Sequence, residues 1–216
     1  MGCSPSSFEE NAAAITKKIE EGLKIDHEIS KKVVKILLLG NEGSGKTTLL
    51  QQMQLIHGKG YSLDEHKNCV SLVHAIALGG LFSILKAMPK LKIDFESSSA
   101  VIDYKLLCKM TGHSCKRKIT SDLGCIMMRI WGDEGVQDCF SRSMEYQLCD
   151  YAGHFLNDLN VIKELDYLPT KTDFLKAQRH TRGIQQIQFS YRSSLFEVYD
   201  FGGNRSERKK WSHCFE

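Results

Sequence analysis

The sequence lacks several features that mark common protein classes. Its eight cysteines form no C-x-x-C pair and no apolar leader segment follows Met1, so we expect reduced thiols in the cytosol. Its 29 basic and 26 acidic side chains give a net charge of +3 and are not gathered into a block, which argues against a nucleic-acid partner. The histidines show no H-x-x-x-H spacing, so we interpret them as surface or core residues rather than metal ligands.

An uncharged stretch over residues 69–85 approaches the length of a membrane-spanning helix. Ser71, His74 and the Gly79-Gly80 pair interrupt it. A helix surrounded by other helices inside a domain is also apolar on all sides. With 216 residues the chain is long enough for such a core, and we predict a buried helix here.

The first residues match a lipidation pattern. Met1 to Ser6 fits M-G-x-x-x-[ST], which predicts myristoylation of Gly2, and the neighbouring Cys3 is a candidate for palmitoylation. One acyl chain binds bilayers only marginally, whereas two give stable attachment. Residues 8–29 then show a helical pattern with a narrow apolar stripe that includes Ile15, Ile19 and Leu23. We expect this helix to dock on a partner; the alternative is a solvated leader.

A phosphate-binding loop is the strongest local signal. Residues 33–39 form a branched apolar run typical of a buried parallel strand, and Gly40 to Thr47, G-N-E-G-S-G-K-T, fits G-x-x-x-x-G-K-[ST] before a helical segment. In such a loop the backbone N–H groups surround phosphates at a helix N-terminus. Lys46 would reach the outer phosphate oxygens and the Thr47 hydroxyl would bind Mg²⁺.

The last seventeen residues identify the family that the chain resembles. Asp200 to Glu216, D-F-G-G-N-R-S-E-R-K-K-W-S-H-C-F-E, resembles the second switch of heterotrimeric G-protein alpha subunits. Leu91 to Phe95, Glu145 to Leu148 and the Met1-Gly2-Cys3 opening are similar to the inhibitory and transducin branch. The Asp200 to Glu216 match makes a P-loop kinase or ATPase improbable.

The resemblance implies an α/β fold, a P-loop Ras-like GTPase domain with an inserted all-helical domain. Thr181, the next threonine expected to bind Mg²⁺, follows Thr47 by far more residues than a short loop needs, and residues 61–168 have a helical pattern with breaks near Pro89, residues 97–99, Gly112, Gly132 and Gly153. Residues 187–191 and 195–199 alternate as a β-hairpin that ends at Asp200. The implied domains are a lipid-anchored helix (1–31), a partial GTPase domain (32–60 and 177–216) and a helical domain (61–176).

Roles follow residue by residue from the same resemblance. Mg²⁺ would be held by Thr47, Thr181 and Asp200, and the Gly203 N–H would meet the terminal phosphate. Asp150 and Tyr151 would lie on the lip that faces the nucleotide, and residues 175–181 would form the first switch. The full set expected to bind GTP or GDP is Gly40, Glu42, Gly43, Ser44, Gly45, Lys46, Thr47, Thr48, Asp150, Tyr151, Leu175, Lys176, Ala177, Gln178, Thr181, Asp200, Phe201, Gly202, Gly203 and Asn204.

The catalytic positions depart from the family pattern. Gln178 stands where the family has the arginine that stabilises the transferring phosphoryl group, and Asn204 replaces the glutamine that orients the attacking water. Glu42 and Gly43 exchange the family's glycine and glutamate, which places a carboxylate near phosphates. Because such an arginine contributes roughly 10³ to 10⁵ in rate, we predict slow hydrolysis of bound GTP.

The resemblance also implies partners, and it leaves two hypotheses open. A signalling subunit would bind a beta-gamma dimer through its N-terminal helix and residues 205–211, couple to G-protein-coupled receptors, and lie on the cytoplasmic face of the plasma membrane, anchored in the inner leaflet. Relative to the family pattern the chain ends inside the second switch, before the N-K-x-D element that reads guanine. We therefore expect a C-terminally truncated member whose residues 33–39 form an unpaired apolar edge. The alternative is a non-enzymatic paralogue or fragment that keeps only the anchoring and beta-gamma-binding surfaces.

Overall fold

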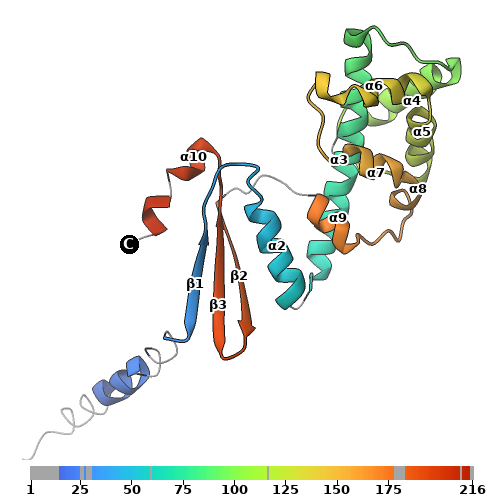
Figure 1. Ribbon diagram of the computed structural model, residues 1–216. Helices are drawn as coiled ribbons and strands as arrows, with labels where there is room; N and C mark the ends of the chain where they lie inside the picture. Colours follow the sequence, from blue (N-terminus) through green and yellow to red (C-terminus); the bar gives the residue numbers. More distant parts are fainter. Residues whose placement is uncertain are drawn as a thin grey trace, which may run out of the picture. The chain divides into compact units, whose positions relative to one another are not determined.

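The computed structural model describes residues 15–24, 27, 31–58, 60–115, 117–177, 183–209 and 211–214 (Figure 1). The chain divides into two compact units, Met1–Gly60 with His180–Glu216, and Tyr61–Arg179. We call them the sheet unit and the helical unit. The functional domains and boundaries expected from the sequence stay predictions.

The sheet unit is built around a small mixed sheet. Strands β1 (Val33–Leu38), β3 (Ser194–Phe201) and β2 (Ile184–Tyr191) lie in the order β1-β3-β2, with β3 central (Figure 1). β1 runs parallel to β3, and β2 pairs antiparallel with β3. The predicted hairpin is thereby confirmed. Its turn lies at Arg192, whose φ of 55° is left-handed.

The first strand is parallel, as expected, but the prediction that it is buried was wrong. Among the described residues β1 is instead an edge strand, which agrees with the other expectation for residues 33–39, an unpaired apolar edge. Val34 is 41 % exposed and Leu39, just past the end of β1, is 38 % exposed. Within the described residues no strand pairs with its outer edge. Buried apolar side chains in the described part of this unit are confined to Leu50, Val198 and Phe201. Helix α2 (Lys46–His57) packs against the hairpin, where the His57 ring stacks on Phe189 with centroids 4.8 Å apart.

The helical unit surrounds one long helix. Helix α3 packs against α6, α7 and α9, and α4 packs against α5. Its fully buried residues include Leu78, Leu81 and Phe155. The elements are α3 (Leu63–Leu91), α4 (Ser98–Thr111), α5 (Ser121–Trp131), α6 (Glu134–Ser141), the 3₁₀ turn η1 (Ser143–Glu145), α7 (Ala152–Asn157), α8 (Leu159–Ile162) and α9 (Lys171–Lys176).

By length and composition α3 could cross a membrane, but 56 % of its most apolar window is buried inside the unit. Because helices cover it on several sides, we interpret it as the core helix that the sequence predicts.

Several predicted breaks coincide with helix ends, and two do not. Gly112 and Gly132 follow α4 and α5, and Ser97 caps the start of α4. Pro89 lies inside α3, which continues to Leu91. Gly153 lies inside α7, where a Cβ would come within 2.5 Å of the Phe140 ring. At Gly153 the missing side chain permits close packing of two helices rather than a turn.

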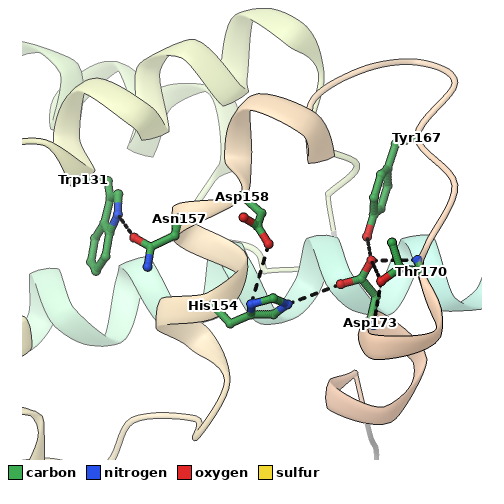
Figure 2. A network of polar contacts seen from close by, with 7 residues as sticks. All are labelled: Trp131, His154, Asn157, Asp158, Tyr167, Thr170 and Asp173. Carbon is green, nitrogen blue, oxygen red and sulfur yellow. Dashed lines mark hydrogen bonds and ion pairs between the residues drawn. The ribbon is translucent and has the colours of Figure 1, made fainter.

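A polar network joins α7 to α9 (Figure 2). The Asp173 carboxylate accepts hydrogen bonds from the Tyr167 hydroxyl (3.0 Å) and from the Thr170 N–H (2.8 Å), and His154 lies between Asp173 and Asp158 at 3.4 and 3.6 Å. Burial raises the pKa of Asp173, but these hydrogen bonds outweigh it and leave that pKa below its usual value. The charged Asp173 therefore anchors the first turn of α9.

Capping boxes begin the first and last helices of the unit. Ser62 and Glu65 form one at α3, and Thr170 and Asp173 form the other at α9. Tyr61, the first residue of the unit, stacks flat on Phe174 of α9 with ring centroids 3.8 Å apart. The two ends of the helical unit are thus in direct contact.

Candidate nucleotide site

The loop Gly40 to Thr47 joins β1 to α2 in the sheet unit. Gly43 and Gly45 have φ values of 76° and 82°, a left-handed conformation that favours glycine. Gly45 is the residue before α2, so the loop closes onto the N-terminal end of a twelve-residue helix. That end offers backbone N–H groups and a positive dipole to an anion.

Lys46 lies across the loop. Its Nζ donates to the Asn41 carbonyl oxygen at 2.7 Å and to Ser44 Oγ at 3.3 Å. The ammonium group is therefore held over the loop and close to its backbone.

Thr47 contacts the end of the central strand. Its Oγ1 donates to Oδ2 of Asp200 at 2.6 Å, and Asp200 is fully buried. Hydroxyl and carboxylate oxygens are the hard donors that Mg²⁺ prefers, and Mg²⁺ sites commonly use only one or two protein ligands with waters and phosphates. These residues fit that ion. Among the residues described, no cluster of three His, Cys, Asp or Glu side chains is arranged to hold a metal by itself.

The segment after β3 packs closely on the loop. A Cβ at Gly203 would lie 2.6 Å from the Asn41 carbonyl carbon and from the Glu42 nitrogen, so only glycine fits without displacing the loop backbone. Arg208 of α10 (Arg205–Arg208) donates to the Asn41 side-chain oxygen at 3.3 Å. Asn41 is a contact residue of this segment that was not among the residues predicted from the sequence.

Asn204 has a structural role in addition to the catalytic position that it occupies in the family pattern. It is the N-cap of α10, and its Oδ1 accepts hydrogen bonds from the Glu207 N–H (2.9 Å) and the Ser206 hydroxyl (2.8 Å). An asparagine three residues before a glutamate at a helix start is a recognisable capping signal.

Further contacts connect this region. Glu207 accepts from the Gly183 N–H at 3.0 Å, and the indole of Trp211, in the turn η2 (Trp211–Cys214), donates to the Gly202 carbonyl at 3.3 Å. Phe201 and Gly202 are buried. The structure thus brings the predicted loop residues, Gly40 and Glu42 to Thr48, together with the predicted residues 200–204 of the sheet unit.

Other predicted residues belong to the helical unit. Asp150 and Tyr151 immediately precede α7, Leu175 and Lys176 end α9, and Ala177 is the residue after it. Gln178, Thr181, Gly2 and Cys3 lie outside the described residues. Their expected roles stay predictions.

A comparison with protein families agrees with this geometry. A family model described as G-protein alpha subunit matches residues 13–216. The matched region contains the phosphate loop, the helical unit and the segment that packs on the loop. The chain therefore belongs to the family of G-protein alpha subunits, guanine-nucleotide-binding proteins of signal transduction.

Proposed function

We propose that this chain is a Mg²⁺-dependent alpha subunit of the inhibitory and transducin-like branch that binds GTP and hydrolyses it slowly. The observation that carries the proposal is the 2.6 Å hydrogen bond between Thr47 of the phosphate loop and the buried Asp200. It joins, across many intervening residues, two of the three side chains that are expected to hold Mg²⁺.

Nucleotide binding would use groups already in place. The N–H groups at the start of α2 would hold phosphate oxygens. The Lys46 ammonium group would give up its hydrogen bonds to the Asn41 carbonyl and the Ser44 hydroxyl and donate to phosphate oxygens instead. Thr47 and Asp200 would hold Mg²⁺, which would neutralise phosphate charge. The Gly203 N–H is carried by the segment that packs against the loop backbone, where it would meet the terminal phosphate.

Slow hydrolysis is supported by the contacts of Asn204. Orienting an attacking water requires an acceptor oxygen, and the Asn204 oxygen already accepts two hydrogen bonds at the start of α10. Its side chain is also one methylene shorter than glutamine. With Gln178 at the arginine position, both groups that accelerate phosphoryl transfer are changed.

Membrane and partner binding follow from the N-terminal segment. Residues 15–24 are helical, and Ile15, Ile19 and Leu23 are 59, 56 and 62 % exposed. An exposed apolar stripe of this kind suits a helix that docks on another protein, here a beta-gamma dimer. Acyl chains on Gly2 and Cys3 would place the chain at the inner leaflet of the plasma membrane, where receptors act on this family.

Binding of a fluorescent GTP analogue tests the proposal. The purified chain should bind the analogue saturably in Mg²⁺, and Lys46→Ala should weaken binding at least about tenfold because a charge-assisted contact to phosphate is lost. Lys35→Ala, which removes an exposed lysine from β1 of the same unit, is the matched control and should bind normally. A folded sample without Lys46-dependent binding would refute the proposal and favour a non-enzymatic paralogue.

Single-turnover phosphate release tests the slow hydrolysis. The wild-type chain should release phosphate far more slowly than an ordinary alpha subunit, and the double variant Gln178→Arg/Asn204→Gln should be faster by a factor of roughly 10³ or more. Release by the wild-type chain at an ordinary rate would contradict the hydrolysis proposal while leaving nucleotide binding intact.

A further inference from the structure

The helical unit contains a cavity of about 470 Å³. Its walls are the first turns of α3, the loop residues 117 and 118 before α5, and residues 164, 165, 167 and 168 after α8. Cavities of roughly 300 to 1,000 Å³ accommodate small organic ligands. All of its lining residues belong to the helical unit, so the cavity is not part of the phosphate loop.

A buried histidine fixes the walls of this cavity. His74 of α3 is 2 % exposed; its Nδ1 accepts from the Ile119 N–H at 3.1 Å, and its Nε2 lies 3.3 Å from the Ile162 carbonyl. Because Nδ1 is an acceptor, the neutral ring carries its proton on Nε2 and donates it to Ile162. One side chain thereby connects α3, the loop before α5 and the end of α8, and the cavity is a defined feature of the fold.

The charged groups around the cavity are mainly cationic. Lys67, Arg117 and Lys118 line it together with one carboxylate, that of Glu164. Glu164 lies 3.5 Å from Lys163, and Lys67 is 3.9 Å from the highly exposed Asp64. Arg117 and Lys118 make no ion pair or hydrogen bond to any part of the chain that the structure describes. These two cations are available to an anion.

The same cavity has an apolar rim. Leu63, Leu165 and Leu168 line it and are 78, 84 and 70 % exposed. Exposed leucines grouped around a cavity are unusual on a monomer surface and indicate a binding site. A small inorganic anion would leave these leucines in water, whereas a neutral apolar molecule would leave the cations without a counter-charge.

We propose that this cavity binds an anionic amphiphile, with a phosphate or carboxylate head on Arg117 and Lys118 and an apolar chain over Leu63, Leu165 and Leu168. The head makes charge-assisted hydrogen bonds, and the chain removes apolar surface from water. The proposal is independent of nucleotide binding, since the two sites share no residue.

Calorimetric titration of the full chain with dodecyl phosphate below its micelle concentration tests the site. Saturable binding is expected. The double variant Arg117→Gln/Lys118→Gln should weaken it at least about tenfold through loss of two charge-assisted contacts, and Leu165→Ser/Leu168→Ser should weaken it through loss of apolar contact. All four positions are exposed, so the fold should be retained, as circular dichroism would verify.

The matched control is Lys105→Gln/Lys109→Gln, which removes two exposed lysines from α4 of the same unit. It should bind dodecyl phosphate as the wild type does, and dodecyltrimethylammonium should bind neither protein. Equal loss of affinity in the control, equal binding of the cationic detergent, or no saturable binding would overturn the proposal. Vesicles that contain phosphatidic acid distinguish two sources of the amphiphile. Arg117-dependent binding of the protein to these vesicles indicates a bilayer lipid. Binding of dodecyl phosphate without binding to vesicles indicates a free amphiphile.

Discussion

The sheet unit and the helical unit differ in how they bury their side chains. The helical unit has a continuous core around α3, with Leu78, Leu81, Met127 and Phe155 fully buried. In the described part of the sheet unit the buried apolar residues are Leu50, Val198 and Phe201, and the most buried polar residue is Asp200. The phosphate loop and its contacts thus belong to the unit with the smaller core.

This difference separates stability from binding chemistry. Regions with few buried apolar contacts open most easily, and ligand-binding segments are commonly drawn from them. We therefore expect the helical unit to dominate unfolding in the absence of nucleotide, and the sheet unit to gain stability when a nucleotide binds to it.

The largest expected effect is in the helical core. Phe155→Ala removes a fully buried ring from α7 and should lower the free energy of unfolding by about 3–5 kcal/mol, measured by urea denaturation. Ile102→Ala, at a position 67 % exposed on α4, should change it by less than about 0.5 kcal/mol. Equal effects of the two substitutions would remove the contrast between the units.

A smaller effect is expected at the phosphate loop. Thr47→Ala removes the hydroxyl that donates to Asp200 and should weaken Mg²⁺-dependent binding of a fluorescent nucleotide roughly tenfold or more, with helical-unit unfolding unchanged. Thr47→Ser keeps a hydroxyl and should restore affinity. If alanine and serine behave alike in a Mg²⁺ titration, Thr47 does not act through its oxygen.

The mildest effect is a pH dependence in the helical unit. Burial, aided by the charge of Lys118, lowers the pKa of His74 below its ordinary 6.5. The unfolded chain therefore takes up a proton at a higher pH than the folded chain. The stability contributed by neutral His74 is thus fully present above about pH 6.5 and is lost as the pH falls toward the pKa of His74 in the folded chain. For one proton the slope is at most about 1.4 kcal/mol per pH unit.

Urea unfolding of the helical unit between pH 7.5 and 5 measures this slope. His74→Gln should flatten it, whereas Ile102→Ala, which removes an exposed side chain of α4 without a titratable group, is the control and should leave the slope unchanged. An unchanged slope in His74→Gln would assign the acid sensitivity to other groups.

Local motifs could be read from the sequence, and contacts between distant segments could not. The order of strand, glycine-rich loop and helix around residues 40–47, the hairpin, and the helix ends at Gly112 and Gly132 depend on neighbouring residues and were predicted correctly. The exposure of β1 depends on which segments cover it. The need for glycine at position 153 depends on the Phe140 ring, which comes from another helix. Neither effect leaves a pattern in its own segment.

The candidate site divides in the same way. Thr47 and Asp200 came from motif positions, and the structure places them in contact. Asn41 was missed because its partners, Arg208 and the backbone around Gly203, are remote in sequence. The capping contact of Asn204 was visible as a local pattern, but the catalytic interpretation of that position obscured it.

The stacked rings of Tyr61 and Phe174 have a consequence for the chain as a whole. They hold the beginning and the end of a unit of more than a hundred residues at van der Waals distance. The helical unit is inserted between the two segments of the sheet unit. Because its ends are in contact, it is equivalent to a short bridge, and the entropy lost when the two segments of the sheet unit come together is that of closing a small loop. Separating the rings would lengthen this effective bridge and increase the entropy lost when the sheet assembles.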